Sequence, residues 1–180
     1  MNGMGFIKRL LGGTDASTGR AEPRRQAPRG TRMLVVDDSP TICAVLGRML
    51  EQDAYAVQKA GDGERALELA KAELPELIFL DIVLPGINGF AVLRALRHDP
   101  LTAHIPIVMI SGNPQATEQF YVQRFGADDF IRKPFGRVDV HASIETLVRA
   151  GRLGARPLEL PQPATTGAAA IPGVAPGMAA

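Results

Sequence analysis

The chain has 180 residues, of which 46% are hydrophobic and 22% are charged, as is typical of a globular protein. No apolar run approaches the roughly 18 residues that a membrane-spanning helix needs, which excludes an integral membrane segment. The single cysteine, Cys43, excludes a disulfide framework and favours a small buried side chain in a reducing compartment, so we expect a cytoplasmic protein.

The net charge of +1 is distributed unevenly. Residues 1–30 carry 6 Lys and Arg against 2 Asp and Glu, a net charge of +4. Residues 31–150 carry 12 Lys and Arg against 16 Asp and Glu, a net charge of −4, and residues 151–180 carry 2 Arg against 1 Glu. The central part is therefore mildly acidic and offers no basic face for nucleic acid.

Composition predicts one folded domain at residues 31–150 between two disordered tails, residues 1–30 and 151–180. The first tail becomes rich in Gly, Pro, Thr and Arg, and the second is rich in Pro, Ala and Gly, so neither can bury a core. For the first tail, a weak helix that docks on a membrane surface or a partner is the alternative to plain disorder. Its apolar face would consist of Phe6, Ile7, Leu10 and Leu11.

Strands and helices are predicted to alternate from Arg32 onward. The strands are expected at residues 33–36, near 55–60, and at 77–80, 105–110 and 129–131. The helices are expected to begin at Pro40, after Asp62, around Phe90, at Asn113-Pro114 and before Val140. Five strands alternating with five helices predict an α/β fold, a doubly wound five-stranded parallel sheet with both faces covered.

Local signals support the helix starts. Ser39-Pro40 supplies an N-cap and a first-turn proline, and Asp62 is a second N-cap. In the helix after Asp62, apolar residues at helical spacing are expected to face inward. These residues are Leu67, Ala70 and Leu74.

The strand at residues 77–80 is apolar throughout and ends at Asp81, just before the Pro85-Gly86 turn. Three other predicted strands also end at polar residues, namely Asp37-Asp38, Ser111 and Lys133. The carboxyl ends of parallel strands meet at one edge of a sheet, where ligands bind. We therefore expect these side chains to converge in one crevice.

The converging residue types indicate phosphoryl chemistry with a metal ion. Three carboxylates repel one another and need a cation to stay ionised, and hard oxygen ligands suit Mg²⁺. No His or Cys accompanies them, which argues against zinc or a transition metal. A lysine and a hydroxyl would contact the oxygens of a phosphoryl group, and a carboxylate can be its nucleophile. The site is thus chemically complete for phosphorylation of Asp81.

Each residue alone has a plainer interpretation. Asp37-Asp38 and Asp81 could each cap a strand-to-helix turn, and Ser111 could be structural. Phe130, on the fifth strand, is by default a core aromatic. Their joint position at four strand ends, which chance would rarely arrange, favours the functional interpretation.

Four segments resemble the receiver domain of bacterial response regulators, over about residues 32–150. They are Val35-Val36-Asp37-Asp38-Ser39, Leu80-Asp81 through Gly89, Ile110-Ser111-Gly112, and Asp129-Phe130-Ile131-Arg132-Lys133-Pro134-Phe135. The resemblance implies a flavodoxin-like sheet with the strand order 2-1-3-4-5. It also implies a binding switch of a two-component system, with self-catalysed phosphotransfer and autodephosphorylation but no enzyme activity toward other substrates.

The resemblance assigns the site residues as follows. Asp81 would accept a phosphoryl group from the phosphohistidine of a histidine kinase. Mg²⁺ would be bound by Asp38 and Asp81, by Asp37 mainly through water, and by the backbone carbonyl of Val83. Lys133 would contact the phosphoryl group, and its peptide bond to Pro134 would be cis.

The resemblance also implies a switch made by Ser111 and Phe130. Ser111 would move toward the phosphoryl group, and Phe130 would turn inward into the vacated space. Partners would dock on the face made by the helix at Asn113, the fifth strand and the last helix. Val83 and Asn113 would tune the lifetime of the phosphate, which the sequence does not fix.

The motifs around Asp81 to Phe90 and Asp99 to Pro106 resemble stand-alone regulators of twitching motility, the chemosensory system that controls type IV pili. A chemotaxis-type kinase and a motility or pilus protein would then be the partners. A flagellar chemotaxis-type regulator and a phosphate sink for a kinase are the alternatives. A haloacid-dehalogenase-type phosphatase is remote, because it needs a second carboxylate where Val83 stands.

Overall fold

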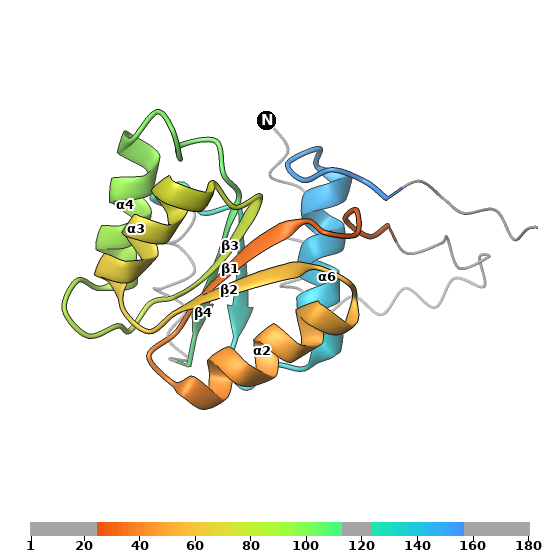
Figure 1. Cartoon of the computed structure of the whole chain (residues 1–180), viewed down its shortest axis with the longest axis horizontal. Helices are drawn as coiled ribbons and strands as arrows, with labels where there is room; N and C mark the ends of the chain where they lie inside the picture. Colours follow the sequence, from red (N-terminus) through yellow and green to blue (C-terminus); the bar gives the residue numbers. More distant parts are fainter. Residues whose placement is uncertain (1–24, 113–123, 157–180) are drawn as a thin grey trace, which may run out of the picture.

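The computed structural model describes residues 25–112 and 124–156 (Figure 1). The strands in these residues are β1 (Arg32–Val36), β2 (Ala56–Ala60), β3 (Leu77–Asp81), β4 (Ile107–Ser111) and β5 (Asp129–Arg132). The helices in these residues are α2 (Pro40–Gln52), α3 (Gly63–Glu73), α4 (Gly89–His98) and α6 (Arg137–Arg149). The helix predicted at Asn113-Pro114 and the apolar face predicted at Phe6 to Leu11 lie outside the described residues.

The five strands form one parallel sheet in the order β2-β1-β3-β4-β5, as predicted. The central strand β3 pairs with β1 on one side, where Val36 is opposite Leu80, and with β4 on the other, where Asp81 is opposite Ile110. β4 begins at Ile107 rather than at Ile105, since Pro106 has no N–H to donate to a neighbouring strand. The carboxyl ends of β1, β3, β4 and β5 therefore lie along one edge.

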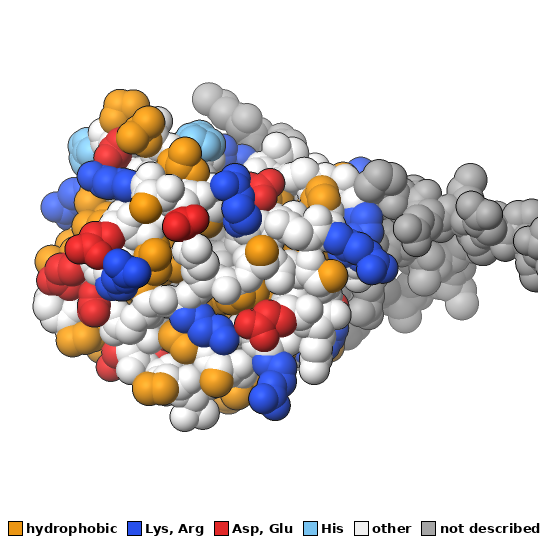
Figure 2. All heavy atoms as spheres, viewed as in Figure 1, with side chains coloured by type: hydrophobic (Ala, Val, Ile, Leu, Met, Phe, Trp, Pro, Cys, Tyr) orange, Lys and Arg blue, Asp and Glu red, His pale blue; other side chains and the backbone are white. Residues whose placement is uncertain are grey.

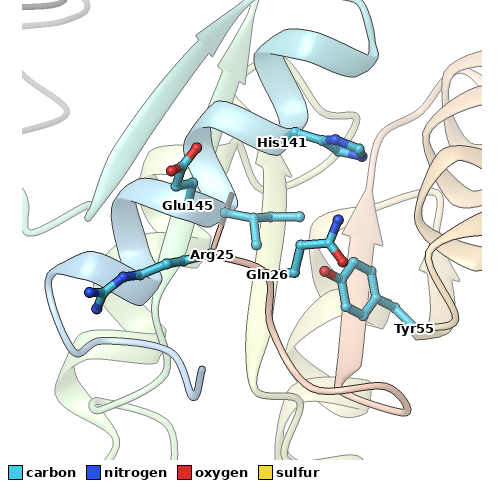
Figure 3. A pocket seen from close by; sticks show the side chains of 6 residues that line it. Arg25, Gln26, Tyr55, His141 and Glu145 are labelled. Atoms are coloured by element: carbon cyan, nitrogen blue, oxygen red, sulfur yellow. The ribbon is translucent and has the colours of Figure 1, made fainter. Parts of the chain in front are cut away.

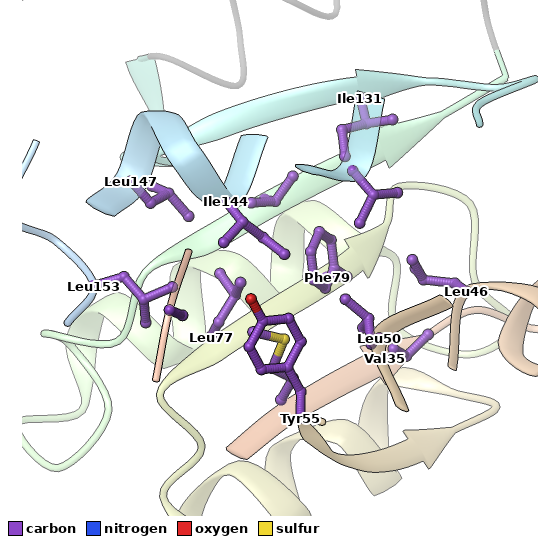
Figure 4. Close-up of a cluster of buried hydrophobic side chains, with 14 of the residues drawn as sticks. Val35, Leu46, Leu50, Tyr55, Leu77, Phe79, Ile131, Ile144, Leu147 and Leu153 are labelled. Atoms are coloured by element: carbon purple, nitrogen blue, oxygen red, sulfur yellow. The ribbon is translucent and has the colours of Figure 1, made fainter. Parts of the chain in front are cut away.

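Helices cover both faces of the sheet (Figure 1), with α2 and α6 on one face and α3 and α4 on the other. Successive strand side chains point to opposite faces, so Phe79 joins the α2/α6 cluster and Leu80 joins the α3/α4 cluster. Figure 4 shows Phe79 among Leu46, Leu50 and Ile144. Every residue of β3 is buried, because the strand is central and both of its faces are covered.

The predicted N-caps are confirmed. Ser39 Oγ accepts the N–H of Ile42 at 3.4 Å, and Asp62 Oδ1 accepts the N–H of Arg65 at 2.7 Å. The prediction that Leu74 faces inward is wrong. α3 ends at Glu73, and Leu74 is its C-cap in the left-handed region (φ 46°), which leaves the side chain 39% exposed.

Two segments near the ends of the described chain pack against each other. The Arg156 N–H donates to Gln26 O at 2.7 Å, and Arg156 Nη1 donates to Gln26 Oε1 at 2.7 Å. Ala27 and Leu153 are buried in the α2/α6 cluster. Figure 3 shows the Gln26 side chain beside Tyr55. Ordered contacts thus lie on both sides of residues 31 and 150, and the domain boundaries stay a prediction.

On the face in Figure 2, acidic and basic side chains are interspersed rather than gathered by sign. Within residues 25–112 and 124–156, no helix combines the length and the apolar character that crossing a membrane requires.

Candidate functional site

Three carboxylates converge where β1 and β3 end. Asp37 and Asp38 directly follow β1, and Asp81 is the last residue of the neighbouring β3. One oxygen from each carboxylate lies within 4.8 Å of the other two. Asp37 and Asp81 are 1% and 3% exposed, whereas Asp38 is exposed to solvent. For the three carboxylates, the convergence predicted from the strand ends is confirmed.

Lys133 reaches this cluster from the other side of β4. It follows β5, and its N–H donates to Ser111 O at 2.7 Å, which fixes its backbone against the end of β4. Its Nζ lies 2.7 Å from Asp37 Oδ2 and 2.9 Å from Asp81 Oδ2. The Lys133-Pro134 peptide bond is cis, as the resemblance implies. One ammonium group therefore bridges two buried carboxylates.

Burial and charge oppose each other at these groups. Burial raises the pKa of Asp81, the hydrogen bond and charge of Lys133 lower it, and the charge of Asp37 raises it again. The net direction is upward. Burial alone would lower the pKa of Lys133, but the hydrogen bonds and charges of Asp37 and Asp81 outweigh it and raise this pKa. Three carboxylates share one lysine, so the pocket retains excess negative charge.

The donor set fits a hard divalent cation. Mg²⁺ prefers oxygen ligands, often one or two carboxylates together with waters and phosphate oxygens. Asp37, Asp38 and Asp81 offer such oxygens within one ion's reach, and Asp38 opens the cluster to solvent. Elsewhere in the described residues, no second group of three potential ligands meets in this way.

Ser111 and Phe130 lie on the two strands beside the cluster. Ser111 ends β4, is fully buried and is opposite Arg132 of β5. Phe130 is opposite Met109 and is 9% exposed, so its ring already packs in the α3/α4 cluster. The core position expected by default for Phe130 is therefore present in this structure.

Val83 is 66% exposed, and its backbone N–H is among the groups that lower the pKa of Asp81 against the effect of burial. This effect was not predicted, and the role of the Val83 carbonyl as a metal ligand stays a prediction. Asn113 lies outside the described residues.

Two further residues hold the site in place. A Cβ on Gly89 would overlap Asp81 O, so only glycine allows α4 to begin this close to the end of β3. The Cys43 thiol donates to Asp37 O at 3.2 Å. Gly89 stands in the motif around Asp81, but residue type alone gives no signal of such an approach. Cys43 is buried, as predicted.

Fold and site together define a doubly wound α/β protein with an acidic, lysine-containing pocket at the carboxyl edge of its sheet. Residues 33–145, more than half of the 180, match the sequence model of the response regulator receiver domain. The chain belongs to this family, the receiver domains of two-component systems.

Two curated relatives are each 39% identical to this chain. Protein PilH of Pseudomonas aeruginosa aligns over 116 residues, which cover 64% of this chain and 93% of PilH. Response regulator PleD of Caulobacter vibrioides aligns over 118 residues, which cover 66% of this chain but only 26% of PleD. The chain thus spans about a quarter of PleD and nearly all of PilH.

Solved structures share the fold. A putative response regulator from Chloroflexus aurantiacus is 30% identical with a TM-score of 0.63, covering 68% of this chain and 98% of its own. The chemotaxis response regulator CheY4 of Vibrio cholerae is 27% identical with a TM-score of 0.57, covering 68% and 96%. The receiver domain of the Pseudomonas aeruginosa sensor kinase PA1611, which has a magnesium ion in its active site cleft, is 26% identical with a TM-score of 0.60, covering 64% and 95%.

Proposed function

We propose that this receiver domain is switched by phosphorylation of Asp81, with a histidine kinase as donor and Mg²⁺ as cofactor. The carrying observation is the bridge from Lys133 Nζ to Asp37 and Asp81 inside a cluster of three carboxylates. A lysine beside a buried aspartate supplies the positive charge that an incoming phosphoryl group needs. The neighbouring carboxylates provide the oxygen ligands for a metal ion.

In the proposed reaction, an Asp81 carboxylate oxygen attacks the phosphorus of the donor's phosphohistidine. The new O–P bond forms as the N–P bond breaks, and the imidazole nitrogen keeps the electron pair and takes a proton. Lys133 stays close to Asp81 and contacts the phosphoryl oxygens. When bound by Asp37, Asp38, Asp81 and the Val83 carbonyl, Mg²⁺ supplies the positive charge that neutralises those oxygens.

We also propose that Ser111 and Phe130 transmit the phosphorylation to the surface. Ser111 ends the strand between Asp81 and Lys133, so its hydroxyl is placed to meet a group on Asp81. Phe130 of β5 is opposite Met109 of β4, and its side chain packs in the α3/α4 cluster. The partner face would include β5 and the start of α6, where Val138 is 71% exposed.

For the pathway, we propose a cytoplasmic regulator of twitching motility that acts by contact with a motility or pilus protein. Its support is the alignment with PilH, which covers 93% of that protein. The likeness to a chemotaxis regulator supports a flagellar chemotaxis-type role as the second candidate. A phosphate sink is the third, and capture of a partner other than the kinase would separate it from both switches.

The test of the acceptor is phosphorylation by acetyl phosphate with Mg²⁺, followed by intact-mass measurement. The wild type should gain one phosphoryl group and Asp81→Asn none. The matched control is Asp62→Asn, which keeps a side-chain oxygen at the N-cap of α3 and lies outside the pocket. Unchanged labelling of Asp81→Asn would refute the assignment. Phosphotransfer measured against every histidine kinase of the source cell would then identify the donor.

A further inference from the structure

The loop at residues 82–88, between β3 and α4, sets the surroundings of the Asp81 carboxylate. The loop starts directly after Asp81, and a Cβ on Gly89 at its far end would overlap Asp81 O. The Val83 N–H in the loop also lowers the pKa of that carboxylate. The far end of the loop is fixed by Gly89, whose N–H donates to Ile82 O at 2.9 Å. The position of the loop therefore decides where the Val83 N–H lies relative to the acceptor.

The first turn of α3 presses against the outer side of this loop. A Cβ on Gly63 would lie 2.5 Å from Ile87 Cγ1 and 2.7 Å from Ile87 O. It would also lie 2.7 Å from Val92 Cγ2 of α4. At the next position, Glu64 places its carboxylate where a Cβ on Gly86 would lie, 2.6 Å from Oε1. Two successive residues of α3 thus adjoin two successive residues of the loop.

The backbone conformation does not require glycine at position 63. Gly63 is the first residue of α3 and is not in the left-handed region, in contrast to Gly86 with φ +71°. Its turn is held by the Asp62 cap on the Arg65 N–H. Space is the remaining reason, since one of the three atoms that a side chain would meet is a backbone carbonyl, which cannot rotate away.

We propose that Gly63 is a positioning residue for phosphorylation. Having no side chain, it lets the side chain and the carbonyl of Ile87 pack against α3, and this contact holds the loop in place beside the Asp81 carboxylate. Gly63 acts through the loop and touches neither acceptor nor donor. The inference rests on the proposed role of Asp81, because it concerns the geometry around that carboxylate.

The test compares Gly63→Ala with Gly61→Ala, its matched control two residues away. A Cβ on Gly61 would meet nothing within 4 Å, so both variants add one methyl group but only one of them reaches the loop. We expect Gly63→Ala to shift the Val83 amide resonance of the metal-free protein and to slow labelling by acetyl phosphate about 10- to 100-fold, because a misplacement of about 1 Å at a reacting centre can cost about 100-fold. Gly61→Ala should match the wild type in both measurements.

Wild-type values for Gly63→Ala in both measurements would overturn the proposal, as would equal effects in the two variants. If Gly63→Ala does not fold, Ile87→Ala decides, since it removes the opposing side chain without adding volume. A shifted Val83 resonance and slower labelling in Ile87→Ala would support the positioning role of Gly63. Wild-type values in both measurements would overturn it. The Val83 resonance is measured without any phosphotransfer. It therefore tests the role of Gly63 even if Asp81 proves not to be the acceptor.

Discussion

Lys133 Nζ lies 2.9 Å from Asp81 Oδ2, although 52 residues separate them in sequence. The same Nζ lies 2.7 Å from Asp37 Oδ2. One flexible side chain therefore joins the ends of β1 and β3 to the segment after β5. A phosphoryl group on Asp81 would compete for this ammonium group, which links the chemistry of the acceptor to the position of β5.

Replacing Lys133 with Ala should separate phosphorylation from output. The carboxylates that hold Mg²⁺ remain, so metal binding should be largely intact, whereas the contact between the phosphoryl group and β5 is lost. Calorimetric Mg²⁺ titration and partner capture by the phosphorylated variant check both parts. Partner binding at wild-type affinity by phosphorylated Lys133→Ala would show that the lysine has no part in switching.

Asp81→Asn should raise the unfolding midpoint of the metal-free protein at neutral pH. Burial raises the pKa of Asp81, so the folded state holds this proton more tightly than the unfolded state. Stability therefore falls as pH rises through the interval above the ordinary value of 3.8, and a neutral amide avoids that loss. Thermal unfolding of both proteins across this pH range measures it. A lower midpoint for Asp81→Asn at neutral pH would contradict the sign.

Mg²⁺ should stabilise the folded protein, since the unfolded chain has no such cluster. At a concentration 100 times the dissociation constant, the gain is about 2.7 kcal/mol. Asp37→Asn should remove most of it. Because the pKa of Asp81 is raised, the affinity for Mg²⁺ should begin to fall at a higher pH than an ordinary aspartate would give. Melting curves with and without Mg²⁺ at several pH values test both statements.

Asp128→Ala should destabilise the fold by less than the roughly 3–5 kcal/mol lost when one partner of a fully buried ion pair is left alone, because this pair is only partly buried. Asp128 Oδ2 accepts from Arg97 Nη2 and from the Ile107 N–H, both at 2.8 Å, and Oδ1 accepts from Arg152 Nε at 2.7 Å. The Arg97 and Asp128 side chains are 18% and 12% exposed. Urea unfolding gives the loss. Arg65→Ala, which breaks an exposed pair with Glu68, should cost less than about 1 kcal/mol.

Removing residues 1–24 should leave phosphotransfer and stability unchanged, whereas removing residues 1–30 should lower stability alone. The longer truncation deletes the buried Ala27 and the Gln26 contacts of Arg156, and neither lies in the acidic pocket. Labelling rates and urea unfolding of both truncations distinguish the cases. A large loss of labelling rate in either would place the N-terminal segment in the site.

The sequence by itself determined the sheet and the residues of the site. Apolar runs and caps such as Ser39 and Asp62 are local signals, and strand ends in a parallel sheet share an edge, so Asp37, Asp81 and Lys133 could be assigned to one crevice. The family motifs added the strand order and the cis bond before Pro134. Both are present in the structure.

Tertiary structure alone decided how close these groups lie and what holds them there. Leu74 has the spacing of a core residue, yet it leaves the helix at its C-cap because α3 ends at Glu73. The contact of Gly63 with Ile87, and that of Gly89 with Asp81 O, depend on how separate elements pack. Residue type and spacing carry no information on such approaches, since close packing is settled only when all the elements share one core.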